Sequence, residues 1–379
     1  MRYYAICIFL IFVVFTSCNE SHEDNGKNYS KFVFEAYSPS NPEIASGFQI
    51  RESDDVKLLE IFNPWDSTFK SQKFYLVNEK DKDLTFPDGK SIKVPIKKLV
   101  VLSASHLSFL DVLNKIDLLV GVSSVKYVVS KKFKGLVESR KIKEIGIGDH
   151  FKLEELINLS PDVVMISPQK GQSFIPLQNA GLTIIPNGDY LESDPLGRAE
   201  WIKFIGVLTG KEKEAIHIFD SIKNEYFQLK KLSETLSYRP TVITGKQYGG
   251  FWNLSGGKSY EAQFIEDAGA DYLWKENYST GGIMLDFETV YGRGLEADYW
   301  RFLVYTSQDY TYEMLKAEDG RYADFAAFKN KKVIVCNTLK KPFFQKGFLE
   351  PQVILADYIH IFHPSLLPHH QNIYYELLK

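Results

Sequence analysis

The sequence of 379 residues has only three cysteines, Cys7, Cys18 and Cys336. It also has little excess charge, since 45 basic and 48 acidic side chains leave a net charge of −3, without a long basic run. This balance excludes the electrostatic footprint of a nucleic-acid-binding protein. No apolar run reaches the ~20 residues that a membrane-spanning helix needs.

Apolar and aromatic side chains are abundant, at 44% and 14% of the residues. Such a chain can bury a sizeable core and does not resemble a disordered segment. Its length exceeds what one hydrophobic core usually organises, so we expect at least two structured units.

The first seventeen residues resemble a secretion signal. Arg2 supplies a positive charge, and residues 5–15 form an apolar run too short to span a membrane. Thr16, Ser17 and Cys18 follow and resemble a bacterial lipobox, with Phe15 in place of the usual leucine. The resemblance implies cleavage after residue 17 and a diacylated Cys18. An ordinary signal peptide with an incidental cysteine is the alternative.

Cleavage there would leave a mature chain without an internal disulfide, because Cys336 would be its only unmodified thiol. Cys336 ends a buried-strand pattern and is expected to be a small core residue. Residues 18–30 are polar and acidic, as in a flexible tether. We therefore expect a soluble body held at a membrane through its N-terminal lipid.

Residues 31–95 alternate strand patterns with turn residues and predict a β-rich extension. The expected strands cover residues 32–34, 47–50, 58–62 and 74–77. This extension carries no recognisable chemistry.

After Pro95, strand patterns alternate with helical ones, which indicates parallel sheets with crossover helices. One set, in residues 96–194, predicts strands at 99–102, 118–122, 162–166 and 183–186, and helices at 107–113, 153–159 and around Leu177. A second set, in residues 239–379, predicts strands at 241–244, 270–274, 302–305 and 331–335, and a helix at 262–268. The fold class is therefore α/β, with two Rossmann-like lobes of duplicated architecture.

Residues 195–238 are expected to be linker helices. Within them, residues 211–236 contain neither glycine nor proline, and apolar side chains recur every three or four positions, namely Ala215, Phe219, Ile222, Tyr226 and Leu229. A helix of that length would extend ~39 Å. We expect it to join the two lobes as a single rigid strut that limits hinge motion.

Several segments in this order resemble the helical-backbone (class III) periplasmic substrate-binding lipoproteins of ABC importers, which deliver cobalamin, ferric siderophores or haem. The similar segments are residues 98–106, 116–122, 153–162, 195–204, 257–260, 268–271 and 285–290. The resemblance covers about residues 95–379. It implies a two-lobed receptor without enzymatic activity, catalytic residues, resident metal or cofactor, which binds its ligand between the lobes.

The resemblance also implies docking of both lobes onto an ABC permease dimer, through an acidic residue on each lobe. Glu154 and Glu288 occupy these positions. Glu154 has a second interpretation, because a carboxylate in the first turn of a helix is stabilised by the helix dipole. Its neighbour Glu155 could take the docking role.

Ligand contacts are expected at the carboxyl ends of the parallel strands. The candidates are Ser105, His106, Tyr127 and Gln169 in the first lobe, and Tyr248, Phe251 and Trp252 in one loop, residues 247–253, of the second. Aromatic faces suit a corrin, porphyrin or catecholate plane, although the same rings could pack in the core. His106 could instead cap the helix that follows it.

Three sequence patterns suggest a phosphate-binding loop, a metal site or a glycosidase pair, but none of them meets the requirements of its motif. Residues 256–259 lack the first glycine of a phosphate-binding loop. Prolines interrupt the C-terminal histidines, His360, His363, His369 and His370, and no carboxylate lies at zinc-ligand spacing. Glu192, Asp194 and Glu200 precede or begin a linker helix, so we expect helix caps and solvated charges rather than a glycosidase pair.

The sequence thus predicts a lipid-anchored protein of the cell envelope, most simply periplasmic, that captures a metal complex and delivers it to a permease. Two alternatives remain open at this point. One is a capture lipoprotein on the cell surface that passes its ligand to an outer-membrane transporter. The other is a lipid-anchored hydrolase.

Overall fold

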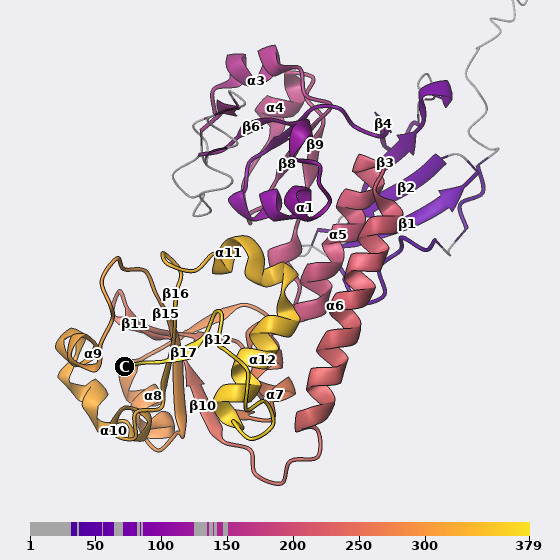
Figure 1. Ribbon diagram of the computed structural model, residues 1–379. Coiled ribbons are helices and arrows are strands. Elements are labelled where there is room, and N and C mark those ends of the chain that lie inside the picture. The colour runs from indigo at the N-terminus through magenta and orange to yellow at the C-terminus, as the bar shows by residue number, and fades with distance from the viewer. Residues whose placement is uncertain are drawn as a thin grey trace, which may run out of the picture.

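The computed structural model describes residues 32–35, 38–54, 56–63, 71–81, 84, 86–124, 135, 139, 142–146 and 151–379 (Figure 1). The expected signal peptide, the tether with Cys18, and Tyr127 lie outside these residues. Within the described ranges, no helix is both long and apolar enough to cross a membrane.

The N-terminal extension is a four-stranded sheet in the order β1-β2-β3-β4. Its strands are β1 (Phe48–Ser53), β2 (Val56–Ile61), β3 (Gln72–Val77) and β4 (Lys90–Lys93). Three of the predicted strands are confirmed. Residues 32–34 form no strand, although Phe32 and Phe34 pack on the outer face of the sheet beside Tyr75.

The two faces of this sheet have different partners because side chains alternate along each strand. Phe48, Leu59 and Phe74 point into the main core of the protein, whereas Leu58 and Tyr75 belong to a small separate cluster. The extension is therefore packed onto the rest of the molecule through one apolar face.

The first lobe holds a parallel sheet in the order β7-β6-β5-β8-β9. Its strands are β5 (Leu99–Val101), β6 (Leu119–Val122), β7 (Lys143–Glu144), β8 (Val163–Ile166) and β9 (Ile184–Pro186). Its helices include α1 (Leu107–Val112), α3 (Leu153–Leu159), α4 (Ile175–Asn179) and the short turns η3 (Ala104–His106), η4 (Ile116–Leu118) and η6 (Asp189–Leu191). The predicted strands and helices of this lobe are confirmed.

The second lobe holds a sheet in the order β13-β10-β15-β16-β17. The strands β10 (Thr241–Thr244), β13 (Asp271–Tyr272), β15 (Tyr299–Val304) and β16 (Val333–Asn337) are parallel, and β17 (Glu376–Leu377) is antiparallel. Its helices include α7 (Tyr260–Asp267), α8 (Phe287–Gly294), α9 (Tyr312–Glu318), α10 (Ala326–Lys329), α11 (Phe343–Lys346) and α12 (Pro351–Phe362). Cys336 is buried in β16, as expected, and burial raises the pKa of its thiol to about 12.

A second, antiparallel sheet of β11 (Lys246–Tyr248), β12 (Phe251–Ser255) and β14 (Gly282–Leu285) corrects one expectation for this lobe. Residues 247–253 are not a loop but a β-hairpin, whose turn is formed by Gly249 and Gly250, both at positive φ. The helices α8 to α12 and the strand β17 were not predicted from the sequence.

The two lobes share one topology. The order β6-β5-β8-β9 in the first lobe and β13-β10-β15-β16 in the second are both 2-1-3-4 when strands are numbered along the chain. The expected duplication of the architecture is thereby confirmed.

The connection between the lobes is a pair of helices rather than a single helix. α5 (Pro195–Thr209) leaves the first lobe and runs toward the extension, and α6 (Glu212–Ser233) returns beside it toward the second lobe (Figure 1). With 22 residues, α6 extends ~33 Å. Its predicted apolar positions Ala215, Phe219, Ile222 and Tyr226 are buried.

One continuous hydrophobic cluster includes side chains of the extension, both lobes, α5 and α6. The parts are therefore fixed against each other by shared packing, in addition to the chain that connects them.

Candidate functional site

A cleft of about 600 Å³ lies between the lobes, at the carboxyl ends of β10 and β15. Tyr190 and Leu191 line it from the first lobe. The lining from the second lobe comprises Gly245, Lys246, Asn253, Leu254, Ser255, Ser259, Tyr260, Glu261, Thr280, Gly281, Gly282, Arg301, Phe302 and Leu303. This is the edge at which open α/β sheets hold their ligands.

One wall of the cleft is the outer face of the small antiparallel sheet. Directly paired residues point to the same face, and the pairs include Lys246 with Asn253, Tyr248 with Phe251, and Asn253 with Met284. Lys246 and Asn253 line the cleft, and Tyr248 and Phe251 continue the same face, with 84% and 52% of their surfaces exposed. The two predicted aromatic residues therefore lie on the same face as this wall, beyond the residues that line the cleft.

Trp252 lies on the opposite face of the same sheet and corrects the prediction for this residue. It is 0% exposed, and its indole Nε1 donates to the Thr244 carbonyl oxygen at 2.9 Å. Its ring packs against Trp300 and Phe325. Trp252 is a core residue with no surface for a ligand, because alternation along β12 turns it away from Phe251.

The floor of the cleft contains a buried ion pair that the sequence analysis did not identify. Arg301 in β15 donates to both carboxylate oxygens of Glu261 in α7, at 2.8 and 3.1 Å, and to Tyr358 Oη at 3.0 Å. Burial opposes ionisation of Glu261, but Arg301 and the Ser255 hydroxyl outweigh it and lower the pKa of Glu261. A charged residue inside the apolar run of β15 was the signal available in the sequence.

His106 is not exposed as a ligand contact, and it occupies the N-cap position of α1. It is 1% exposed, and its Nε2 lies 3.3 Å from Oδ1 of Asp189, a carboxylate that is itself 1% exposed. It makes no side-chain cap to α1. His106 follows β5 and Asp189 follows β9, two strands that flank β8 in the sheet, and their side chains form a buried pair inside the lobe rather than a ligand contact.

The other candidates of the first lobe lie near the strand ends without reaching the cleft lining. Ser105 is half-buried, and its Oγ lies 2.9 Å from Ser103 Oγ. Gln169 is exposed after β8 and lines two neighbouring cavities of about 580 and 220 Å³.

Glu154 and Glu288 occupy corresponding places in the two lobes. Glu154 lies in the first turn of α3, which precedes the third strand β8, and Glu288 lies in the first turn of α8, which precedes the third strand β15. Both side chains are exposed. Glu288 is not the cap of its helix, because Asp286 accepts the Thr289 backbone N–H at 2.6 Å.

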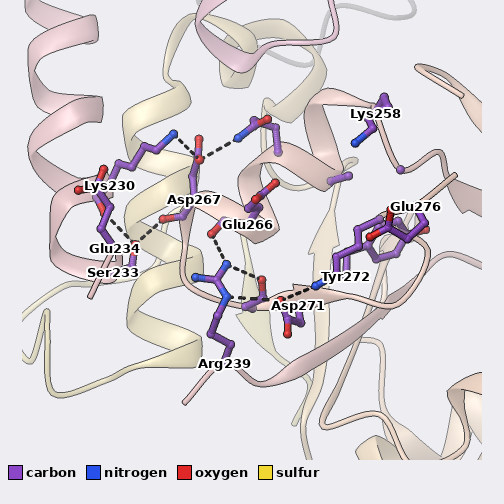
Figure 2. A pocket seen from close by; sticks show the side chains of 15 residues that line it. Lys230, Ser233, Glu234, Arg239, Lys258, Glu266, Asp267, Asp271, Tyr272 and Glu276 are labelled. Atoms are coloured by element: carbon purple, nitrogen blue, oxygen red, sulfur yellow. Dashed lines mark hydrogen bonds and ion pairs between the residues drawn. The ribbon is translucent and has the colours of Figure 1, made fainter. Parts of the chain in front are cut away.

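A polar cavity of about 570 Å³ lies elsewhere, on the side of the second lobe where β10 and β13 begin (Figure 2). Its charged groups are largely paired with each other, as in Lys230 with Asp267 at 2.8 Å and Arg239 with Asp271 at 3.4 Å. It shares no lining residue with the cleft and is therefore a separate feature.

The C-terminal histidines do not converge. His370 pairs with Asp357 at 2.7 Å, while His363 contacts the Gly269 carbonyl oxygen and His360 that of Leu367. Across the part of the chain that the structure describes, no three His, Cys, Asp or Glu side chains are grouped to hold a metal ion.

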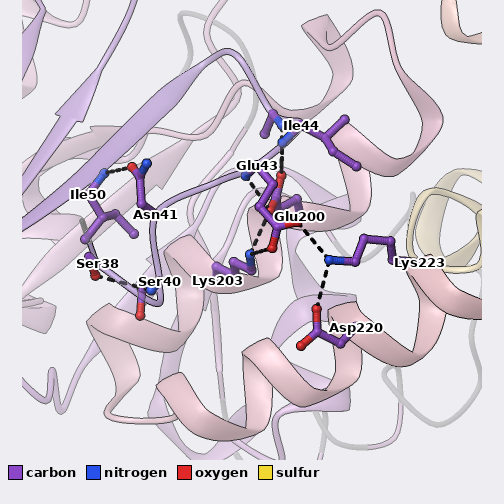
Figure 3. Close-up of polar contacts among 11 residues, drawn as sticks. Ser38, Ser40, Asn41, Glu43, Ile44, Ile50, Glu200, Lys203, Asp220 and Lys223 are labelled. Atoms are coloured by element: carbon purple, nitrogen blue, oxygen red, sulfur yellow. Dashed lines mark hydrogen bonds and ion pairs between the residues drawn. The ribbon is translucent and has the colours of Figure 1, made fainter. Parts of the chain in front are cut away.

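The three acidic residues near the linker differ from each other. Asp194 caps α5 by accepting the Leu196 N–H at 2.7 Å, as expected. Glu192 and Glu200 are not solvated: they are 4% and 0% exposed. Glu200 accepts backbone N–H groups of residues 43–45 and the Lys203 ammonium, so it holds the N-terminal extension against α5 (Figure 3).

Two lobes of equal topology, a helical connection and a cleft between the strand ends define a two-lobed solute-binding protein. Residues 99–338 match the model of the periplasmic binding protein family, and the chain belongs to this family.

Relatives include two proteins of Methanocaldococcus jannaschii that are named as uncharacterized lipoproteins. One is 28% identical over 312 residues, which cover 78% of this chain and 73% of the relative. The other is 26% identical over 343 residues, which cover 86% of each chain.

Solved structures with the same fold include Helicobacter pylori CeuE with Ni(II) bound, with a TM-score of 0.57, 17% identity, and coverage of 76% of this chain and 90% of that chain. An ABC-type Fe³⁺-hydroxamate transport protein from Saccharomonospora viridis has a TM-score of 0.55 and 16% identity, covering 71% and 94% of the respective chains. The fold is thus that of the class III periplasmic binding proteins.

Proposed function

We propose that this protein is the substrate-binding lipoprotein of an ABC importer. It captures a metal complex, namely cobalamin, a ferric siderophore or haem, in the cleft between its lobes and delivers it to the permease dimer. The observation that carries the proposal is a cleft of about 600 Å³, lined from both lobes at the carboxyl ends of the strands. Its volume falls within the ~300–1,000 Å³ typical of small-molecule sites.

The chemistry of the cleft supports a planar or aromatic ligand. Tyr248 and Phe251 present rigid apolar faces, and each buries contact area at low cost in conformational entropy. Lys246 adds an ammonium group at the cleft, although Glu318 already lies 2.5 Å from it.

The polar groups of the cleft support binding rather than hydrolysis. Glu261 is engaged by Arg301, the Ser255 hydroxyl donates to Glu261, and Ser259 caps α7 by accepting the Ala262 N–H. A hydrolase of the serine type would need a hydroxyl hydrogen-bonded to a base that a third group orients. The Ser255 hydroxyl does bond to a carboxylate, but Glu261 is a poor base because Arg301 lowers its pKa despite burial, and the Ser259 hydroxyl caps a helix.

Equilibrium titration with cobalamin, haem and a ferric hydroxamate tests the proposal. We expect one of them to bind with a dissociation constant between micromolar and nanomolar, about −8 to −12 kcal/mol. Replacing Tyr248 and Phe251 together by alanine should weaken binding at least about tenfold, because an aromatic stacking contact contributes ~1–3 kcal/mol. Tyr238→Ala is the control, since Tyr238 is 60% exposed before β10, at the far end of the strands. No binding of any of the three ligands would contradict the proposal.

Docking on the permease is assigned to Glu154 and Glu288, which are exposed at corresponding positions of the two lobes. Charge reversal of both to lysine should leave ligand affinity unchanged and abolish uptake in cells, because like charges would then face the arginines of the permease. Reversal of Glu225 and Glu234, two exposed residues of the α6 region, makes the same change in net charge and should leave uptake intact. Normal uptake by the variant with Glu154 and Glu288 both reversed would show that neither residue is needed for docking.

Lipid attachment at Cys18 is part of the proposal and is supported by relatives that are named lipoproteins. Labelling of cells with radioactive palmitate should mark the wild-type protein but not Cys18→Ala. Equal labelling of both proteins would contradict attachment at this cysteine.

A further inference from the structure

A second cavity, of about 580 Å³, lies between the N-terminal extension and the first lobe. From the extension it is lined by Ser46, Gly47, Ile61, Phe62, Asn63 and Gln72. The first lobe and α5 contribute Ile166, Pro168, Gln169, Gly171, Gln172, Phe174, Pro186, Gly188, Leu191, Glu192 and Trp201. The extension thereby provides one wall of a partly open space that the first lobe and α5 alone would not form.

The chemistry of this cavity selects against a charged occupant. Glu192 is the single ionisable group among the described residues that line it, and its carboxylate already accepts the Gly47 N–H and the Trp201 indole N–H, both at 2.9 Å. The other polar groups are neutral amides and one hydroxyl. Large apolar side chains such as Phe62 and Phe174 supply much of the remaining lining. A bound charge would find no free counter-charge here, whereas an apolar group would gain by leaving water.

The wall formed by the extension is held firmly. The backbone of residues 43–47 donates to Glu200 and Glu192, and Lys223 bonds to the Glu43 carboxylate at 2.8 Å (Figure 3). Phe48 packs on Trp201, with ring centroids 4.7 Å apart. The part of the wall formed by residues 46 and 47 is therefore held in place, as in pre-formed ligand sites.

The cavity adjoins the cleft. Leu191, in the turn η6, lines both spaces, and its neighbour Tyr190 lines the cleft. A ligand in the cleft can thus present a substituent to the cavity on the other side of Leu191.

We propose that this cavity is a second binding compartment, which takes an uncharged, mainly apolar organic group carried as a side arm by the ligand of the cleft. The assignment of the group to a side arm rests on the proposed function. Binding of an apolar group in the cavity does not rest on the proposed function. The side-arm assignment and the apolar binding can therefore be tested separately.

The first test uses N-phenyl-1-naphthylamine, an uncharged apolar fluorophore, with energy transfer from tryptophan as the signal. Gly188→Leu fills the cavity without backbone strain, because Gly188 has φ −101° and an added Cβ would lie 3.5 Å from Leu191 Cδ1 and 3.8 Å from Trp201 Cζ2. Gly282→Leu is the matched control, because Gly282 lines the cleft and not the cavity.

We expect saturable binding of the fluorophore to the wild-type protein, at least about tenfold weaker binding to Gly188→Leu, and binding within about twofold of wild type for Gly282→Leu. Circular dichroism melting checks that Gly188→Leu is folded. Absence of saturable binding to the wild type, or equal affinity in a folded Gly188→Leu protein, would overturn the compartment.

The second test separates the side arm from an independent small molecule. Ferrioxamine B acylated on its free amine with an acetyl or a hexanoyl group gives two uncharged chelates that differ by four methylene groups. Since each buried methylene contributes ~0.8 kcal/mol, the hexanoyl chelate should bind at least about tenfold more tightly than the acetyl chelate. Gly188→Leu should abolish this difference without weakening the acetyl chelate.

Equal affinity of the two chelates for the wild type would overturn the side-arm assignment. Failure of both chelates to bind would instead count against the proposed function for this ligand class. The fluorophore result would still decide whether the compartment binds an apolar group.

Discussion

At the scale of single residues, the function of a charged side chain in this protein depends on partners far away in the sequence. Arg301 belongs to an apolar strand, yet it contacts Glu261 in α7, Tyr358 in α12 and Tyr375 near the C-terminus. A buried guanidinium is tolerated only when its donors are paired in this way. The resulting network fixes α7, β15 and α12 under the cleft.

The Glu261–Arg301 pair gives a pH dependence of stability. The pKa of Glu261 is lower in the folded protein than its ordinary value of 4.5. Ionised Glu261 therefore contributes stability above about pH 4.5, and this contribution is lost as the pH falls through the folded-state value. Glu261→Gln should cost about 3–5 kcal/mol near pH 7, because it leaves Arg301 buried without its counter-charge.

Urea denaturation of Glu261→Gln and wild type at neutral and acidic pH measures this effect. The difference in unfolding free energy should shrink on going from about pH 7 to about pH 3. Glu266→Gln is the control, because Glu266 is on the same helix but exposed, and it should change little at either pH. A constant difference across this range would show that the charge of Glu261 is not the stabilising feature.

At the scale of secondary-structure elements, the contact between α5 and α6 depends on the absence of a side chain. A Cβ at Gly206 would lie 2.6 Å from the Cβ of Ala215. Carbon atoms do not approach so closely without a shift of the backbone, so Gly206 sets the distance between the two helices.

Gly206→Ala should therefore destabilise the protein by about 1–3 kcal/mol, the usual cost of overpacking. Ala215→Gly alone should cost ~1 kcal/mol through helix propensity. The double variant should be destabilised by less than the sum of the two single destabilisations, because removal of one Cβ makes room for the other. Unfolding midpoints of the four proteins complete this cycle, and simple additivity would argue against the steric contact.

At the scale of the whole molecule, the extension is part of the fold and not an independent attachment. Its apolar face joins the same hydrophobic cluster as the lobes and helices. It also supplies the backbone donors of two buried carboxylates, Glu192 and Glu200.

Deletion of residues 32–93 should therefore abolish cooperative folding of the remainder, since it exposes Trp201 and removes the backbone donors of both carboxylates. Thermal melting followed by near-ultraviolet circular dichroism measures this. A milder variant keeps the prediction testable: Phe48→Ala should cost about 3–5 kcal/mol, whereas Val33→Ala, at a residue 78% exposed, should cost little. A truncated protein that melts as the full chain does would contradict this view.

Much of the fold could be predicted because the secondary structure depends on local sequence patterns. The central strands of the two main sheets and the helix α3, but not the edge strands β7 and β17, follow from apolar runs and helical periodicity, which depend on neighbouring residues only. The buried face of α6 follows from the same periodicity. Residues 32–34 have a strand pattern but form no strand, although the next residue, Glu35, makes a single bridge to Glu52 of β1.

The candidate site was less predictable, as Phe251 and Trp252 show. They are adjacent aromatic residues, and from the sequence either of them could contact a ligand. Pairing of β12 with β11 and β14 decides that Phe251 lies on the cleft side and Trp252 in the core. His106 is a second example, because its buried partner Asp189 follows a different strand.

The sequence by itself determined the α/β class, the duplicated lobes and the long helix that follows the first lobe, since each of these features follows from sequence patterns a few residues long. Only the tertiary structure decided which aromatic residues lie on the cleft side, which groups pair with Arg301, Glu192 and Glu200, and that the extension forms one wall of a second cavity. These features depend on contacts between segments far apart along the chain. Hydrophobic periodicity specifies that a side chain is buried, but not which distant group it meets.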